Sequence, residues 1–346
     1  MPIATGRFQC RYNRSILVGG ASLILALLVS LLLRCLRPMA VPFPGGHQHN
    51  GSTDADVQAD IAFIPIQSNA TAASIEMKIL PGLGGSTPMH GRWDGYATII
   101  TMPTRSEVST TQNHQSIFSV LGPIGGCASD SGHLSKTSVN AQQNDCDVGV
   151  NGSPFNRGGG CIGQSISNGR PVCQDCSLWA GIPSIGLSTA NTSSVGNGVT
   201  GAKWIIGTGV NYSLAESMGV YNMLVGHVPG WLVRQGIVQI PANHSDGTLA
   251  PRTAVGITAD GSRLILLVVD GCEHCPGFMG GAKGLSVYEL AVEMMKLGAA
   301  FALNLDGGGS STMFAKGTGI VNYPVSFDYA PIYHERPVST MLCIRL

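Results

Sequence analysis

The sequence of 346 residues has few charged side chains, and those it has cancel. Asp, Glu, Lys and Arg together make up 12% of the chain, and the formal net charge is zero. Proteins that hold nucleic acid on a basic surface carry an excess of Lys and Arg. We therefore expect no nucleic-acid partner.

The motifs of several common enzyme classes are also missing. The glycine-rich run at residues 307–312 reads GGGSST and has no Lys before its hydroxyl residues, which disfavours a P-loop. Neither of its serines lies in a Gly-x-Ser-x-Gly elbow, which disfavours an α/β hydrolase. A helical pattern precedes the run instead of following it, which disfavours dinucleotide binding. The 47 glycines follow no collagen period, and we interpret them as turns in a β-rich fold.

Residues 15–33 are one apolar segment, with the sequence SILVGGASLILALLVSLLL. Its length is close to what a bilayer requires, and no convincing cleavage site follows it. The flanking arginines weakly favour a cytosolic N-terminus. We expect a cytosolic tail at 1–14, a transmembrane signal anchor at 15–33, a stem at 34–61 and a folded lumenal domain at 62–346. The protein would then reside in the secretory pathway, in the Golgi or a related compartment, or be secreted if the segment is cleaved.

The ten cysteines agree with an oxidising compartment, where an even number predicts disulfides of undetermined pairing. Two CxxC pairs, at 173–176 and 272–275, lie too far apart for a zinc ribbon, so structural disulfides are favoured over zinc. Sequons predict surface glycans at Asn50, Asn69, Asn191, Asn211 and Asn243. The sequon at Asn151 is followed directly by Pro154, and we expect it to be unmodified if Asn151 lines a pocket.

The C-terminal half carries the clearest secondary-structure signals. Two β-type runs between residues 253 and 270 are joined by Asp260-Gly261, which predicts a hairpin. Ser286 and Glu289 form a capping box before a helical pattern that ends near Gly298. A buried strand, AAFALNL, follows and ends at Asp306. Together these elements predict an α+β fold: a single β-rich, mixed-sheet domain with few helices.

The segment LNLDGGGSSTMF, residues 303–314, therefore lies in a loop just past the end of a strand. The N–H groups of Gly307, Gly308 and Gly309 can approach an anion closely. The hydroxyls of Ser310, Ser311 and Thr312 suit phosphate or sugar oxygens. The alternative is a tight turn in which Asp306 hydrogen-bonds its own backbone.

This segment resembles the signature of the phosphodiester glycosidase family. Four further blocks resemble that family in the same order: GVNGSPFN at 149, GHVPGWLVRQG at 226, PRTAVGITADGSRLILLVVDG at 251 and ERPVSTMLCI at 335. Five ordered blocks are more specific than a single glycine-rich loop. The chain departs from the family pattern at Ser153-Pro154 and in the insert CEHCPGFMGGAK.

The resemblance implies hydrolysis of a sugar-1-phosphodiester at the glycosidic bond, which releases a sugar such as N-acetylglucosamine and leaves a phosphomonoester. Arg252 and Arg336 would hold the phosphate together with the glycine N–H groups. A carboxylate would act on the sugar carbon or on water, with Asp306 as first choice, then Asp270 and Glu335. A structural salt bridge between Arg336 and Glu335 is the alternative for that arginine.

Two asparagines of the second block, Asn151 and Asn156, would bind sugar hydroxyls or an acetamide. The implied reaction requires no cofactor, although Asp270 with Asp306 would also suit a divalent cation beside the phosphate. The partners would be a phosphoglycan or another sugar phosphodiester, and the membrane through residues 15–33. Two alternatives stay open: a non-catalytic module that binds glycans or phosphosugars, and the same chemistry on a cell-surface polysaccharide phosphodiester.

Overall fold

A computed structural model describes residues 59–87, 91–104, 117–122, 134–156, 161–172, 181–188, 202–244, 247–327 and 329–346. These residues all belong to a compact unit that runs from Thr53 to Leu346. The expected cytosolic tail and membrane segment, and nearly all of the stem, lie outside the described residues. Within the described part of the chain, no helix is long and apolar enough to cross a bilayer. The first strand begins at Asp60 rather than after residue 61.

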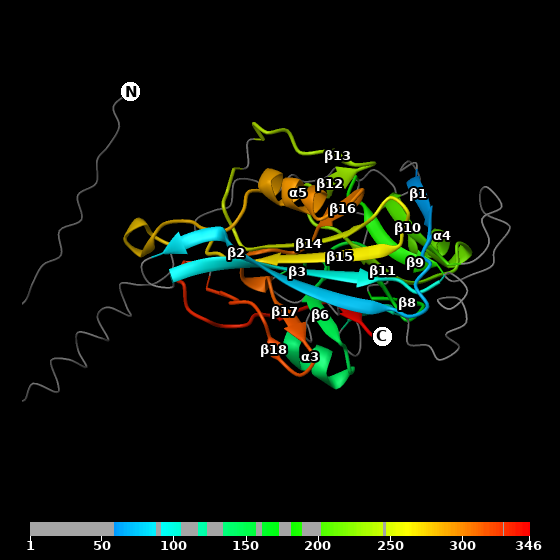
Figure 1. Ribbon diagram of the computed structural model, residues 1–346, viewed down its shortest axis with the longest axis horizontal. Coiled ribbons are helices and arrows are strands. Elements are labelled where there is room, and N and C mark those ends of the chain that lie inside the picture. The colour runs from blue at the N-terminus through cyan, green and yellow to red at the C-terminus, as the bar shows by residue number, and fades with distance from the viewer. Residues whose placement is uncertain are drawn as a thin grey trace, which may run out of the picture. The chain divides into compact units, whose positions relative to one another are not determined.

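A seven-stranded antiparallel sheet occupies the middle of this unit (Figure 1). Its strands follow the order β13-β12-β16-β14-β15-β3-β2. Their bounds are β2 Ser74–Thr87, β3 Gly91–Thr101, β12 Trp231–Arg234, β13 Ile237–Val238, β14 Arg252–Ile257, β15 Arg263–Val269 and β16 Phe301–Asn304. The predicted hairpin is confirmed, since β14 pairs with β15 and Gly261 adopts a positive φ of 65° in the turn.

Helix α5 (Val287–Lys296) covers one face of this sheet (Figure 1). Its predicted capping box is present, because Ser286 accepts from the Glu289 N–H and Glu289 reaches back to the Ser286 N–H. Leu290 and Met294 are buried against sheet residues such as Leu267. Leu267 and its alternate neighbours on β15 point toward the helix, whereas the residues between them point to the opposite face.

The opposite face packs against two further antiparallel sheets in the main hydrophobic core. One has the order β1-β10-β9-β11-β7-β8, with β1 Asp60–Pro65, β7 Ile166–Ser167, β8 Arg170–Pro171, β9 Ser184–Ser188, β10 Lys203–Thr208 and β11 Val220–Val225. The other has the order β18-β17-β6-β20-β4, with β4 Phe118–Leu121, β6 Val148–Asn151, β17 Met313–Ala315, β18 Gly319–Ile320 and β20 Met341–Ile344. The short strands β5 (Ser135–Lys136) and β19 (Pro337–Val338) pair with each other.

Helices are few among the described residues, as expected. Besides α5 they are α3 (Thr137–Gln143), α4 (Tyr212–Ser217) and two 3₁₀ turns, η2 (Gly277–Met279) and η3 (Gly308–Ser310). The expectation of mixed sheets needs correction, since every pairing between the described strands is antiparallel. The segment β15–α5–β16 does join two strands of the same direction, but β14 lies between them and pairs with both.

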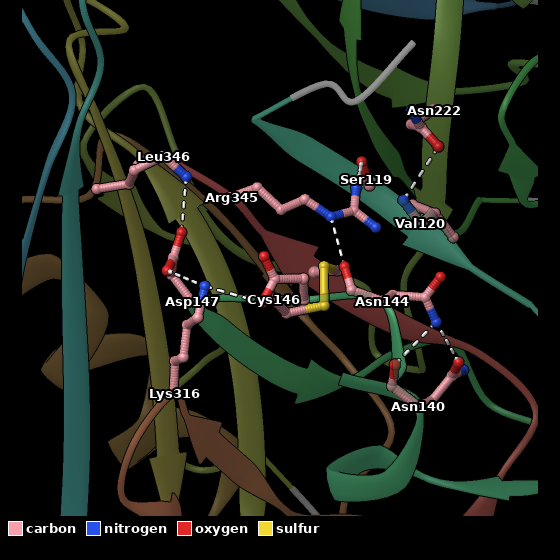
Figure 2. The surroundings of a disulfide bond; sticks show 12 residues. Ser119, Val120, Asn140, Asn144, Cys146, Asp147, Asn222, Lys316, Arg345 and Leu346 are labelled. Atoms are coloured by element: carbon pink, nitrogen blue, oxygen red, sulfur yellow. Dashed lines mark hydrogen bonds and ion pairs between the residues drawn. A yellow bond between two sulfur atoms is a disulfide. The ribbon is translucent and has the colours of Figure 1, made fainter. Parts of the chain in front are cut away.

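Two disulfides join described cysteines. Cys146 and Cys343 connect the segment before β6 to the C-terminal strand, across a sequence separation of 197. Figure 2 shows this bond beside Arg345, whose guanidinium donates to the Asn144 carbonyl at 2.8 Å and to the Ser119 hydroxyl at 3.0 Å. The second bond, Cys272–Cys275, confirms the disulfide interpretation of that CxxC pair. The other CxxC pair, at 173–176, lies outside the described residues.

Candidate functional site

Three sheets meet around Asp306. This residue follows β16 of the seven-stranded sheet, and the glycine loop after it, residues 306–312, leads into β17 of the five-stranded sheet. A second connection, residues 226–230, passes from β11 of the six-stranded sheet to β12. The two connections are joined because the N–H of His227 donates to the Asn304 carbonyl at 2.7 Å. The fold therefore brings loops from all three sheets to one point.

Asn151, at the end of β6, ties these loops together from below the surface. Its side-chain amide donates to the Asp306 carbonyl at 2.6 Å, and its Oδ1 accepts from the Thr253 hydroxyl at 2.8 Å and the Thr312 N–H at 3.1 Å. The side chain is fully buried. Asn151 therefore supports the loop instead of facing a sugar, and its burial excludes a glycan on the folded chain.

The glycine loop uses several of its own N–H groups internally, which differs from the expected anion cradle. The N–H of Gly308 donates to the Pro251 carbonyl at 2.8 Å, and the N–H of Gly307 donates to the Asp306 carboxylate. A side chain at position 309 would require a shift of its surroundings, since its Cβ would lie 2.6 Å from the main-chain Cα of Ser326 and 2.4 Å from Nη2 of Arg336. Glycine is thus required here partly for the close approach of an arginine.

The three hydroxyls of the loop are also not presented to a ligand as expected. Ser310, Ser311 and Thr312 are all buried, with at most 1% of their surface exposed. The Ser310 hydroxyl lies near enough to the Asp306 carboxylate to lower its pKa, although it makes no hydrogen bond of ordinary geometry within the described part of the chain. These hydroxyls therefore belong to the interior of the loop.

Asp306 itself is partly exposed, and His227 and Arg336 both act on its carboxyl. Burial of the carboxyl among protein atoms raises its pKa. His227 opposes this effect most strongly among its neighbours, and the charge of Arg336, the nearby Ser310 hydroxyl and the hydrogen bond from the Gly307 N–H also lower the pKa. Arg336 is itself held by donation from Nη2 to the Ser326 carbonyl at 2.7 Å.

His227 is a member of the site that sequence reasoning did not single out. Its Nδ1 lies 3.0 Å from the Val228 carbonyl, and a proton on Nδ1 would satisfy that contact. The ring nitrogen Nε2 would then be the proton acceptor. The residue lies in the block GHVPGWLVRQG. An ionisable side chain in the short connection between Gly226 and Gly230 was the one feature of the sequence that could have drawn attention to it.

Asp270 ends β15 but lies inside the protein, with 2% of its surface exposed. Its Oδ1 accepts from the Asn322 amide at 3.0 Å and from the Tyr323 N–H at 2.8 Å, and Tyr96 also hydrogen-bonds it. Burial raises the pKa of Asp270 to about 7, against the effect of these hydrogen bonds. Asn322 in turn donates to the Ser311 carbonyl, so Asp270 supports the glycine loop from behind.

Glu335 and Arg252 also hold structure in place. The Glu335 carboxylate accepts from the N–H of Ser138 at 2.8 Å and from its hydroxyl at 2.5 Å, at the start of α3. This use at a helix N-terminus explains its burial and gives Glu335 a structural role in the described part of the chain. Arg252 donates through Nε to the Leu285 carbonyl and through Nη2 to the Thr248 carbonyl, at 2.9 and 2.8 Å, so two of its donors hold main chain in place.

The remaining predicted residue, Asn156, is exposed at the edge of the described segment. Within the described ranges, no group of three or more His, Cys, Asp or Glu side chains is arranged to hold a metal ion. The Oδ1 atom of Asp270, which was expected to suit a divalent cation together with Asp306, already accepts two hydrogen bonds.

Residues 144–345, more than half of the chain, match the sequence model of the phosphodiester glycosidase family. The chain belongs to the phosphodiester glycosidase family. The expected resemblance is confirmed, and the matched region contains His227, Asp306 and Arg336. The block GVNGSPFN, which begins at residue 149, also lies within it.

Individual members of the phosphodiester glycosidase family share about 30% of their aligned residues with this chain. The N-acetylglucosamine-1-phosphodiester alpha-N-acetylglucosaminidase of Bos taurus is 30% identical over 248 residues, which cover 66% of this chain and 42% of that protein. The Homo sapiens protein of the same name is 29% identical over the same length and is covered to 43%. The chain thus spans less than half of these relatives.

A solved structure shows the shared fold. It is the catalytic domain of zebrafish N-acetylglucosamine-1-phosphodiester alpha-N-acetylglucosaminidase, auto-inhibited by its pro-peptide. The TM-score is 0.59 at 23% identity, with 84% of this chain and 89% of that chain covered.

Proposed function

We propose that this phosphodiester glycosidase hydrolyses a sugar-1-phosphodiester at the glycosidic bond, releasing a sugar such as N-acetylglucosamine and leaving a phosphomonoester. The observation that carries the proposal is the position of Asp306, which is partly exposed where three sheets meet and is close enough to His227 and Arg336 for both to lower the pKa of its carboxyl. The activity for which the Bos taurus and Homo sapiens relatives are named supports the choice of N-acetylglucosamine as the sugar.

The leaving group sets the demands on the site. A phosphate monoester has a second pKa of about 6, so it departs with less proton donation than a sugar alkoxide would need. Its negative charge must instead be met by a cation. Arg336 is the arginine of the expected pair whose charge reaches Asp306, so we assign it to the phosphate. Arg252 is not assigned to it, because two of its donors are bound to main-chain carbonyls.

Asp306 is assigned to the sugar carbon. When the bond between that carbon and the phosphate oxygen breaks, its electron pair leaves with the phosphate and the carbon becomes oxocarbenium-like. A carboxylate at this position acts as nucleophile or as base toward water, and the two modes give opposite anomers. If Asp306 is the base, it takes the proton that water releases on adding to the carbon. If Asp306 is the nucleophile, His227 would accept that proton when water later cleaves the bond between the sugar carbon and Asp306. The anomer formed first, followed by NMR, distinguishes the two modes.

The reaction as proposed requires no metal or other cofactor. The alternative, assistance by a divalent cation, predicts that a chelator abolishes turnover and that added Mg²⁺ or Ca²⁺ restores it. Turnover unchanged by chelation supports the cofactor-free form.

The direct test uses the purified chain and a mannoside that carries N-acetylglucosamine-1-phosphate. We expect the wild type to release N-acetylglucosamine and Asp306→Asn to lower kcat by about 100-fold to 10,000-fold. Asp260→Asn, which removes an exposed carboxylate in the β14–β15 turn, is the matched control and should leave kcat unchanged. Equal turnover by Asp306→Asn and the wild type would remove Asp306 from the chemistry.

The same experiment addresses the two alternatives. A non-catalytic module would bind the mannoside in calorimetry without turnover, and the internal use of the loop N–H groups is the observation in its favour. A cell-surface polysaccharide phosphodiester as substrate would appear as higher kcat/KM on that polymer than on the mannoside.

Placement in the lumen of the secretory pathway is part of the proposal. Two disulfides and the exposed sequons at Asn69 and Asn243 support it. The anchor at 15–33 and the Golgi as compartment are proposed from the sequence. A protease-protection experiment on microsomes, with glycosidase treatment of the protected chain, tests the topology.

A further inference from the structure

A short loop after β18 gathers large apolar side chains at the surface. Phe327, Tyr329, Ile332 and Tyr333 have 39%, 66%, 56% and 49% of their surface exposed. Single exposed apolar side chains are ordinary, but several within seven positions of the sequence are characteristic of a binding surface. Because these exposed apolar side chains lie close to the candidate active site, they are candidates for a surface that binds part of the substrate.

The base of this loop is well fixed. The N–H of Ser326 donates to the His334 carbonyl at 3.0 Å, and the N–H of His334 donates to the Pro324 carbonyl at 2.9 Å. The Ser326 hydroxyl also contacts Nδ1 of His334 at 2.5 Å. Phe327 lies between two other rings, with its centroid 5.1 Å from that of His334 and 6.2 Å from that of Tyr329. These three residues form what we call the ring cluster.

Tyr333 takes a different position from the ring cluster. Its ring packs edge-on against Tyr323 at 5.2 Å, and Tyr323 packs against the buried Trp93 at 5.8 Å. Tyr333 therefore belongs to the packing of the loop against the interior. The ring cluster is the part of the loop that offers aromatic surface to a ligand.

The ring cluster is directly connected to the candidate active site. Arg336 donates to the carbonyl of Ser326, the residue immediately before Phe327. A Cβ at Gly309 would lie 2.6 Å from the Ser326 Cα, so the glycine loop and the base of the aromatic loop are in contact. The charge of Arg336 lowers the pKa of Asp306, and the hydrogen bond from Arg336 to Ser326 continues from there to the base of the ring cluster.

We propose that the ring cluster binds the sugar ring on the far side of the phosphate, which is the alcohol part of the phosphodiester. This inference rests on the proposed function. If the released sugar faces Asp306 and the phosphate faces Arg336, the second alcohol extends toward Ser326 and Phe327. The apolar C–H face of a hexose packs on Phe or Tyr rings, and the Tyr329 hydroxyl and the His334 ring can hydrogen-bond its hydroxyls.

The test compares two substrates that share N-acetylglucosamine-1-phosphate. In one the phosphate is esterified to the 6-hydroxyl of a methyl hexoside, and in the other to methanol. We expect Tyr329→Ala and Phe327→Ala to raise KM for the hexoside ester about 3-fold to 10-fold, the range that a single aromatic contact supplies. KM for the methyl ester and kcat for both substrates should stay within about twofold of the wild type.

Phe278→Ala is the matched control, because Phe278 is an aromatic residue of η2 with 81% of its surface exposed. It should change neither KM, and thermal unfolding checks that every variant is folded. The proposal is overturned if Tyr329→Ala and Phe327→Ala leave both KM values unchanged, or raise both equally. In either case wild-type turnover still supports the proposed function, whereas a wild type that cleaves neither ester removes the function and the ring-cluster proposal together.

Discussion

The side-chain amide of Asn151 donates a 2.6 Å hydrogen bond to the main-chain carbonyl of Asp306, across 155 positions of the sequence. The other end of the same amide accepts from Thr253 and Thr312. One buried side chain thus joins β6 and β14 to both ends of the glycine loop. The main chain of Asp306 is therefore held from inside the protein by a fully buried residue.

The first prediction concerns this positioning role. Asn151→Asp keeps the oxygen that accepts from Thr253 and Thr312. It replaces the amide donor with a second oxygen, which would face the Asp306 carbonyl. We expect the free energy of unfolding to fall by about 1–3 kcal/mol, the usual penalty for a buried polar group without its partner. We also expect kcat to fall more than KM rises, because the displaced group is Asp306. Urea unfolding and steady-state kinetics measure the two effects.

Asn156→Asp is the control for Asn151→Asp, since it makes the same change in the same sequence block at an exposed position. Stability should be unaffected there. A fall in kcat for Asn156→Asp equal to that for Asn151→Asp would contradict the positioning role.

The second prediction separates Glu335 from the chemistry. Glu335→Ala removes the acceptor of both the N–H and the hydroxyl of Ser138 at the start of α3. We expect a loss of about 1–2 kcal/mol in the free energy of unfolding, typical of a lost helix cap, with kcat per folded molecule retained. A large loss of kcat at unchanged stability would instead restore Glu335 as a catalytic candidate.

The sequence was sufficient to predict local elements but not their use of side chains. The β14–β15 hairpin and α5 follow from Asp260-Gly261 and from the Ser286 capping box, which are signals within a few residues. Glu335 binds a residue that is distant in the sequence, and Arg252 binds main-chain carbonyls. No sequence motif predicts hydrogen bonds of either kind. His227 was missed for the same reason, because its proximity to Asp306 arises only when β12 pairs with β16.

The third prediction concerns pH and Asp270. Burial raises the pKa of this carboxyl to about 7 from an ordinary value of 3.8, so between these values the folded protein holds a proton that the unfolded chain has released. Stability is therefore highest below this window and falls as pH rises through about 7, by up to about 4 kcal/mol. Asn in place of Asp270 mimics the protonated acid, so Asp270→Asn should abolish this part of the pH dependence.

The comparison of Asp270→Asn with the wild type isolates this group from others that titrate nearby. The charge of Asp94 and a hydrogen bond with Tyr96 both act on Asp270. Asp94 and Tyr96 themselves are unchanged in the variant. Asp260→Asn is a control of opposite sign. Burial raises the pKa of Asp260, but hydrogen bonds from Thr258 and Ser262 outweigh it and lower the pKa overall. Asp260 thus contributes stability that is lost toward low pH. Parallel curves of stability against pH for Asp270→Asn and the wild type between pH 4 and 8 would refute the prediction.

The fourth prediction compares the two disulfides in which both cysteines belong to the described residues. Cys146–Cys343 closes a loop with a sequence separation of 197, whereas Cys272–Cys275 closes one with a separation of 3. Because a longer closed loop restricts the unfolded chain more, replacing Cys146 and Cys343 with Ala should reduce the free energy of unfolding by about 2–5 kcal/mol. The corresponding double replacement of Cys272 and Cys275 should have a smaller effect. Denaturant unfolding at fixed pH measures both, and the reverse order would show that native-state packing dominates.

The fifth prediction tests whether Gly309 serves Arg336. An alanine Cβ at position 309 would lie 2.4 Å from Nη2 of Arg336, so Gly309→Ala should displace the guanidinium. Arg336→Lys removes the planar group directly. Each variant should weaken inhibition by inorganic phosphate roughly 10-fold to 100-fold, since a hydrogen bond to a charged group contributes about 1.5–3 kcal/mol.

If both substitutions act on the same contact, the double variant Gly309→Ala/Arg336→Lys should weaken phosphate inhibition little more than either change alone. Gly247→Ala is the control, because a Cβ there meets no atom within 4 Å. Effects of Gly309→Ala and Arg336→Lys that simply add would mean that Gly309 acts elsewhere, for instance on Ser326. Such additivity would also mean that Gly309 affects the base of the aromatic loop without acting through Arg336.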